Sequence, residues 1–336
     1  MPRPILLRAL FLLLAAELLA QPRIGIIDFY GRRKVSEEQL RKALAAKEGD
    51  PLPRSKADVE EALEHVPGVV QARLEATCCT EGKAILYVGI EEKGAPHFDY
   101  NAPPLGTVKL PAEIHFEYEK FLAAVGLAVR AGETGEDLSQ GHSLMSNAAV
   151  RKHQERFAEL AKEHLTGLRE VMRGSADGEH RAIAAYVIGY APKKQDVVND
   201  LQLALRDPDD TVRNNAMRSL GAIAVLAARD PEQEIKISPT WFIELLDSLI
   251  WPDRSTAAVT LVTLTEKRDP AILSHMKERA MPTLAEMARW KHLPHALPAF
   301  ILLGRVAGFP EAEIQDAWSK GEKQAFLERV LKPARK

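Results

Sequence analysis

Hydrophobic and polar positions in residues 23–93 follow first a strand pattern and then a helical one. The run RIGIIDFYG at 23–31 is rich in residues that favour β-strands, and it ends at a glycine, where the chain can turn. Ser36 and Gln39 then have the spacing of a capping box, which satisfies free N–H groups at the start of a helix. Two stretches with apolar residues every three or four positions follow. The pattern predicts one strand and then two helices.

The period returns to two in the second half of this segment. Apolar and polar side chains alternate from Val70 to Cys79, which predicts a strand with one buried face. A turn at Glu81-Gly82-Lys83 leads into another alternating run that ends at Glu91-Glu92. Residues 23–93 are therefore predicted to form a βααββ unit of the α+β class, with two helices over one face of a three-stranded sheet.

Residues 94–110 separate this unit from a helical remainder. They are rich in Pro, Gly and small polar side chains, which indicates a linker. Residues 111–334 have helical spacing, apart from a glycine-rich polar stretch between Ala131 and Asn147 that is too long for a tight connection. We therefore predict two domains, an α+β unit and a larger all-α domain. The chain as a whole is predicted to be mainly α-helical.

An internal repeat runs through the helical part. An Arg is followed after three residues by Ala and after seven by Ile or Leu; the pattern begins at Arg181 and returns at Arg213 and Arg254. A last copy without the Arg begins at Ala299. The intervals of 32, 41 and 42 residues (181 to 213, 213 to 254, and 257 to 299) are typical of stacked helix pairs.

Two family resemblances follow from these patterns. The run from Asp207 to Gly221 resembles the HEAT repeat, including its bacterial bilin-lyase-like variety, which implies a right-handed all-α solenoid whose concave face binds proteins or peptides. Residues 23–93 resemble a POTRA domain, which implies a periplasmic location and binding of polypeptide by strand addition at an exposed sheet edge. The positions that carry the second resemblance are Gly31, Val35-Ser36, Leu40, Leu44, Gly49-Asp50, Val59, Leu63, Pro67-Gly68-Val69, Leu86, Val88 and Glu91.

The N-terminus has the pattern of an export signal. Arg3 and Arg8 precede an apolar run of twelve residues at 9–20, and polar sequence resumes at Gln21. The run is shorter than the roughly 20 residues that a membrane-spanning helix needs. We predict that residues 1–20 are a cleaved signal peptide and that the protein is periplasmic. The alternative is an uncleaved anchor, which would place the domains on the periplasmic side of the inner membrane.

Composition and cysteine content narrow the classes of function. The net charge of −2 offers no electrostatic reason to expect nucleic acid as a partner. The two cysteines, Cys78 and Cys79, are adjacent, so no disulfide framework is predicted. Their positions in the alternating strand predict that Cys78 is buried in the core and that Cys79 is a free, reactive thiol.

Several groups of residues have a type and spacing that catalysis or metal binding could use. We expect each of them to have a structural role instead. We expect the repeated arginines to form ion pairs with turn aspartates such as Asp177, Asp207, Asp210 and Asp253. His142-Ser143 could be a base and a nucleophile, but neighbours in sequence seldom face each other. Glu159 with Glu163, and His292 with His295, supply only two metal ligands each. The four tryptophans are predicted to pack in the core: Trp241, Trp251, Trp290 and Trp318. No catalytic residue, metal site or cofactor is predicted.

The sequence therefore predicts a non-catalytic protein that binds or scaffolds a protein or peptide of the bacterial cell envelope. We expect the second helix of each repeat to supply the contacts, with Lys194, Asn199 and Gln202 on an exposed polar face. In this interpretation the first helices form the outer row. The alternatives are an enzyme of the bilin-lyase type and a single-pass membrane-anchored factor for division or assembly. Membrane contact is expected only if the N-terminal segment stays uncleaved.

Cleavage of the N-terminal segment can be tested directly. We expect the mature protein to begin near Gln21 and to fractionate with the periplasm, because the apolar run is too short for a stable anchor. Intact-mass measurement of protein from fractionated cells checks this. A mass that corresponds to Met1 through Lys336, found in the membrane fraction, would instead support the anchored alternative.

Overall fold

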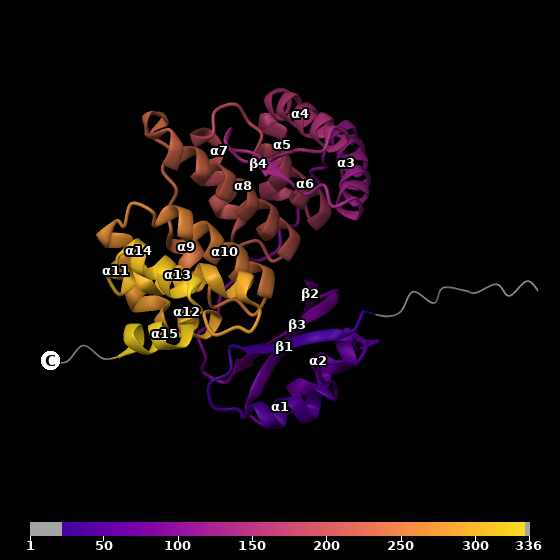
Figure 1. Cartoon of the computed structure of the whole chain (residues 1–336). Helices are drawn as coiled ribbons and strands as arrows, with labels where there is room; N and C mark the ends of the chain where they lie inside the picture. The colour runs from indigo at the N-terminus through magenta and orange to yellow at the C-terminus, as the bar shows by residue number, and fades with distance from the viewer. Residues whose placement is uncertain (1–21, 333–336) are drawn as a thin grey trace, which may run out of the picture.

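The structure is a computed structural model, and it describes residues 22–332 (Figure 1). The predicted signal peptide at 1–20 lies outside the described residues. Within 22–332, no helix combines the length and the apolar character that crossing a membrane requires.

The N-terminal unit has the predicted order of elements. These are β1 (Ile24–Tyr30), α1 (Glu37–Leu44), α2 (Lys56–Glu64), β2 (Val69–Thr80) and β3 (Lys83–Glu92). The strands lie in the order β1-β3-β2, with β1 parallel and β2 antiparallel to β3. The predicted cap is confirmed, since the Ser36 hydroxyl accepts a hydrogen bond from the Gln39 amide at 3.3 Å.

Both faces of this sheet are buried, although the sequence predicted cover for only one. The first face packs against α1 and α2 through side chains such as Leu40, Leu63 and Val88. Ile85 and Tyr87 point to the opposite face and belong to the core of the helical domain. Because β3 is the central strand, its side chains from Ala84 to Ile90 are buried without alternation.

Aromatic side chains join the sheet to the helical domain. Tyr87 stacks on Trp251 with ring centroids 4.6 Å apart, and its hydroxyl lies 2.7 Å from Nδ1 of His295. The Tyr30 hydroxyl donates to the Leu249 carbonyl at 2.7 Å, and the Tyr30 ring meets Trp290 edge-on. The prediction that tryptophans pack internally is confirmed for Trp251 and Trp290. The N-terminal unit is thus fixed against the C-terminal repeats, below them in Figure 1.

Residues 94–110 are irregular but run along the helical domain as a strap. Phe98 is buried, and the Tyr100 hydroxyl lies 2.9 Å from the Ser248 hydroxyl. Further along, the Asn101 amide donates to the Arg206 carbonyl at 2.7 Å, and the Ala176 amide donates to the Gly106 carbonyl at 2.8 Å. The segment therefore contacts the turns before three successive repeats.

The remainder is helical and forms stacked pairs. The first helices of successive pairs pack side by side in one row, α6 on α8, α8 on α10 and α10 on α13, whereas the second helices touch one another less. This arrangement confirms a helical repeat domain. The elements are α3 (Ala112–Arg130), β4 (Glu136–Asp137), β5 (Leu144–Met145), α4 (Ala148–Glu163), α5 (Leu165–Gly174), α6 (Gly178–Ile188), α7 (Gln195–Ala204), α8 (Asp210–Arg229), the 3-10 helix Pro231–Gln233, α9 (Thr240–Leu245), α10 (Trp251–Leu264), α11 (Pro270–Arg279), α12 (Met281–Met287), α13 (Leu293–Val306), α14 (Glu311–Ser319) and α15 (Lys323–Leu331).

The repeated arginines form the predicted internal ion pairs. Arg181 donates two hydrogen bonds to the Asp207 carboxylate, both at 2.8 Å. Arg213 pairs with Asp253 at 2.9 Å and also donates to the Asp207 carbonyl at 2.8 Å. Each arginine therefore ties its own helix to the turn that starts the next repeat.

The third arginine departs from the expected partner. Arg254 lies 3.5 Å from Glu286 of α12, rather than beside a turn aspartate. The Glu286 carboxylate also accepts hydrogen bonds from the Gly31 amide at 2.8 and 3.0 Å. A Cβ at Gly31 would lie 2.3 Å from the Ile90 carbonyl oxygen, so glycine is required where the N-terminal unit meets this carboxylate.

The expectations for the two cysteines are wrong. Cys78 and Cys79 form a disulfide with each other, and both side chains are exposed. Side chains alternate between buried and less buried only as far as Leu74, since Ala76 is already exposed. The pairing of β2 with β3 is irregular between Thr77 and Thr80, so a period of two does not extend to the cysteines.

The Arg213–Asp253 pair is the most deeply buried of these ion pairs, and its loss should be costly. Both residues are almost fully buried, so Arg213→Met leaves an unpaired carboxylate in the core. We expect a loss of about 3–5 kcal/mol in the free energy of unfolding. The double variant Arg213→Met/Asp253→Leu should lose less. Urea denaturation measures both, and the exposed Arg229→Met on the same helix is the control, with an expected change of about 0.5 kcal/mol or less. Equal values for Arg213→Met and the control would refute the structural role.

Candidate functional site

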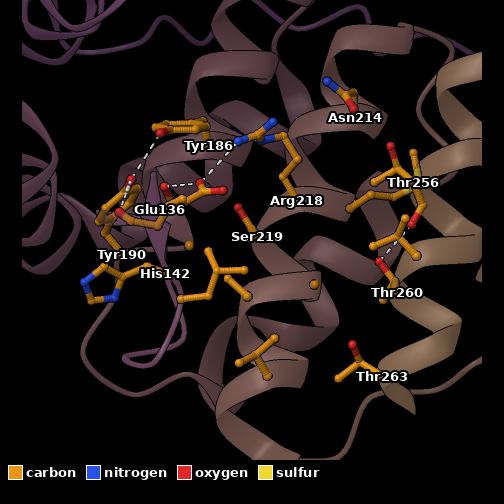
Figure 2. A pocket seen from close by; sticks show the side chains of 18 of the residues that line it. Glu136, His142, Tyr186, Tyr190, Asn214, Arg218, Ser219, Thr256, Thr260 and Thr263 are labelled. Carbon is orange, nitrogen blue, oxygen red and sulfur yellow. Dashed lines mark hydrogen bonds and ion pairs between the residues drawn. The ribbon is translucent and has the colours of Figure 1, made fainter. Parts of the chain in front are cut away.

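A pocket of about 300 Å³ opens on the row of first helices. Its walls come from α6, α8 and α10, and one end is closed by the segment 132–147 that carries β4 and β5 (Figure 2). Most lining positions on the helices are apolar or carry a single hydroxyl group. Pockets of this kind, with a few polar groups on an apolar wall, are typical ligand sites, and this volume lies near the lower end of their range.

Small residues on facing helices shape the floor. A Cβ at Gly189 would lie 2.5 Å from the Ser219 hydroxyl oxygen, so glycine lets the end of α6 approach α8 closely. Gly221, Ala222 and Ser255 have short side chains where α8 faces α10, which leaves the space above them open. Gly189 and Gly221 hold the same position in successive repeats, eight residues after Arg181 and Arg213.

Some polar groups that line the pocket already have hydrogen-bond partners within the protein, and others are available to a ligand. The Ser219 hydroxyl donates to the Ala185 carbonyl at 3.2 Å, and the Thr260 hydroxyl donates to the Thr256 carbonyl at 3.0 Å. The Asn214 side chain makes no hydrogen bond with any other described residue, and Figure 2 shows it at the rim. Asn214 can therefore offer both a donor and an acceptor to a ligand.

One ion pair lies beside the pocket. Arg218 on α8 is 3.4 Å from the Glu136 carboxylate, which also accepts a hydrogen bond from the Ser143 hydroxyl. Both charges are partly exposed, so the pair adds little stability and can be exchanged for a ligand's charge. The pocket thus presents one cation and one anion near a mostly apolar interior.

Residues 132–147 are held against the first repeats by several hydrogen bonds. The Tyr190 hydroxyl donates to the Ser143 carbonyl at 2.9 Å, and Gln154 donates to the Ser143 hydroxyl at 3.0 Å. Lys194 donates to the Gly189 carbonyl at 2.7 Å and to Nδ1 of His142 at 2.9 Å. The stretch that the sequence marked only as a long glycine-rich loop is therefore a wall of the pocket.

Burial changes the charge states at this contact. Burial lowers the pKa of Lys194 to about 7. Burial, assisted by the neighbouring Lys194 charge, lowers the pKa of His142 to about 4. Near neutral pH, His142 is therefore the neutral acceptor that its hydrogen bond with Lys194 requires.

The three residues predicted to bind a partner do not meet in this site. Lys194 is buried with its amine bonded inside the protein, so the expectation of an exposed side chain is wrong. It is the N-cap residue of α7 and so precedes the helix on whose polar face it was expected. Asn199 is exposed on α7, and Gln202 is half-buried and donates to the Ser238 carbonyl at 3.2 Å. None of the three lines the pocket.

The pocket does not lie on the row of helices that was expected to supply the contacts. The pocket lies on the first helices, because these pack closely through small residues and leave the second helices outside. Sequence reasoning missed Asn214 and Arg218 in particular. Their spacing of four places them on the same side of α8, where Arg218 is exposed and Asn214 is half-buried.

The sheet edges, which were expected to accept a further strand, are occupied in part. On β2, the Ala72 amide donates to Glu64 at 3.0 Å and the Leu74 amide donates to Glu60 at 2.7 Å. On β1, the amine of Lys291 donates to the Ile27 carbonyl at 2.6 Å. Because an added strand needs these amide and carbonyl groups, the edges are poorly suited to strand addition.

The remaining candidate pairs have structural roles. His142 and Ser143 are not hydrogen-bonded to each other among the described residues, since Ser143 donates to Glu136 and His142 contacts Lys194. His295 is bonded to Tyr87, as described above.

The acidic pair on α4 is likewise engaged. Glu163 lies near Glu113 and His164, with ligand atoms within 4.8 Å of one another. The Arg156 guanidinium lies 3.6 Å from Glu113 and 3.9 Å from Glu163, and it also pairs with Glu159. The Arg156 guanidinium therefore offsets part of the negative charge of this group.

Comparison with known proteins agrees with the repeat architecture. A family model described as HEAT repeats matches residues 165–236, the part from α5 to just beyond α8. This part includes α6 and α8, which form two of the pocket walls. None of the curated proteins compared with the chain matches it.

The contact between His142 and Lys194 predicts a pH dependence of the wall. The folded pKa of His142 is below its ordinary value of 6.5, so its contribution is complete above about pH 6.5 and is lost as the pH falls towards 4. We expect hydrogen-exchange protection of residues 132–147, corrected for intrinsic rates, to decrease over that range.

In His142→Asn this decrease should disappear. His65→Asn, a change at an exposed histidine of the N-terminal unit, should leave it as in the natural protein. A decrease of the same size in His142→Asn would show that another group controls the wall.

Proposed function

We propose that this protein is a non-catalytic polypeptide-binding protein of the bacterial cell envelope, and that the pocket on α6, α8 and α10 is its binding site. The observation that carries the proposal is the mostly apolar pocket of about 300 Å³ on a HEAT-like helical stack. HEAT repeats generally mediate interactions between proteins, and the pocket has room for one or two large side chains of an extended peptide.

The polar groups around the pocket suit a peptide backbone. Asn214 at the rim can bond a peptide N–H and C=O together, while Arg218 and Glu136 offer one charge of each sign. Val259 is an exposed apolar side chain on the α10 wall, and a bound peptide would cover it. A partner that inserts an apolar side chain here would gain most of its affinity from removing these surfaces from water.

The envelope location is supported by sequence. Arg3 and Arg8 with the apolar run at 9–20 favour export with cleavage, and inner-membrane anchoring is the alternative. The βααββ order of the N-terminal unit is compatible with the POTRA-like resemblance. We assign that unit a supporting role, because one face of its sheet is packed on the repeats, the other is covered by α1 and α2, and side chains already bond part of its edges.

A matched pair of variants tests the binding site. Val259 on α10 is 54% exposed in the pocket, and Leu203 on α7 is 51% exposed outside it. Because both are exposed, replacement by Glu should change stability little at either position. We expect a library of random displayed peptides, selected on the natural protein, to yield binders enriched in apolar side chains.

Val259→Glu should weaken those binders by about tenfold or more, which corresponds to about 1.4 kcal/mol or more of binding free energy. Leu203→Glu should leave their affinity unchanged. The affinities are measured by fluorescence anisotropy with the selected peptides. A selection that yields no peptides, or equal losses in both variants, would contradict the proposal.

A further inference from the structure

Helix α3 ends the helical stack with large apolar side chains exposed on both flanks of its outer face. Phe116, Leu122, Leu127 and Val129 are 51–63% exposed. The opposite side of the same helix is buried against α4 and α6 through Ile114, Phe121 and Ala128. Figure 1 shows α3 at the margin of the helical domain.

Such a face is unusual for the end of a repeat array. Terminal units normally carry a polar outer surface, because no further repeat covers them. The last described helix, α15, follows this rule, since its exposed side chains are Gln324, Ala325, Glu328 and Arg329. Clusters of exposed large apolar side chains mark interaction surfaces. The face of α3 is therefore a candidate for contact with another molecule.

Charges on this face indicate which molecule fits. Glu119 and Arg130 are eleven residues apart, which is three helical turns, so both point away from the core in nearly the same direction. Arg130 makes no ion pair among the described residues. Between them lie Ala123 and Gly126, and a Cβ at Gly126 would meet only a side-chain nitrogen of Arg130, at 3.9 Å. Glu119 and Arg130 thus lie at opposite ends of this face, and the residues at its centre have small side chains or none.

The charges on α3 are complementary to those on a second α3 helix that runs in the opposite direction. In an antiparallel pair of α3 helices, Glu119 of each copy lies opposite Arg130 of the other, so two ion pairs form. A parallel pair would place like charges together. The midpoint of residues 119 and 130 falls between Ala124 and Val125, which sets Ala123 opposite Gly126 and allows a close approach of the two helices.

We propose that the protein forms a two-fold symmetric homodimer through antiparallel packing of α3 on α3. A contact of this kind uses the same patch on both copies, as two-fold symmetry requires. It removes Phe116, Leu122, Leu127 and Val129 of each copy from water, while the ion pairs set direction and register. Helix α3 contributes no residue to the pocket lining, so each copy keeps its own binding site.

Charge reversal tests this interface. We expect size-exclusion chromatography with light scattering to show a dimer for the purified full chain at 10–100 µM, in round numbers about the range where moderate dimers persist. Glu119→Arg and Arg130→Glu should each weaken dimerisation at least tenfold, because like charges then face each other twice. The double variant Glu119→Arg/Arg130→Glu should restore the dimer, since both ion pairs form again with reversed polarity.

The control is Glu266→Arg, a reversal at an exposed position in the turn after α10, which should leave the dimer unchanged. Circular dichroism melts establish that each variant is folded. Three outcomes would overturn the proposal: a natural protein that is monomeric at 100 µM, a dimer unaffected by either single reversal, or a folded double variant that stays monomeric. The first would leave the face of α3 to another kind of partner, and the other two would place the dimer interface elsewhere.

Discussion

The buried arginine–carboxylate contacts hold the molecule together as one unit. Arg181 with Asp207, Arg213 with Asp253, and Arg254 with Glu286 each join one first helix to the start of the next repeat or to a neighbouring helix. Such buried charges tolerate little displacement, because a buried charge that loses its partner strongly lowers the free energy of unfolding. They therefore set the relative position of α6, α8 and α10, which are the walls of the pocket.

The same arginines also fix the parts that are not repeats. The Arg213 guanidinium lies 4.2 Å from the centre of the Tyr100 ring, in the strap that follows the sheet. Arg254 lies 4.8 Å from the centre of the Tyr30 ring, and its partner Glu286 accepts the hydrogen bonds of Gly31. The N-terminal unit consequently packs against the helical domain, and one face of its sheet becomes part of the interior. This docking makes that face of the sheet unavailable to a partner.

The proposed functions use surfaces that this framework leaves open. The pocket faces solvent on the first-helix row, and α3 presents an apolar face at the end of the stack. If two copies pair through α3, two pockets act in one assembly, and a polypeptide that can reach both gains affinity through effective concentration. Neither surface requires a change in the packed core, so both can be altered by substitution without unfolding the repeats.

The sequence by itself determined the order βααββ, the helical remainder and the repeat with its arginines. These follow from local rules: the hydrophobic period, capping residues such as Ser36, and the need of a buried arginine for a nearby carboxylate. It also determined that Trp251 and Trp290 are packed, as large apolar side chains on helices usually are.

Only the tertiary structure decided which surfaces are free. Lys194 has the pattern of a polar helix residue, yet its amine is enclosed between the nearby Gly189 carbonyl and His142, and His142 belongs to a loop about 50 residues earlier in the chain. Tyr87 lies on the strand face that a lone sheet would expose, and burial there depends on Trp251, more than 160 residues later in the chain. A periodic pattern shows that a side chain is apolar or polar, whereas burial depends on what the rest of the chain places beside it.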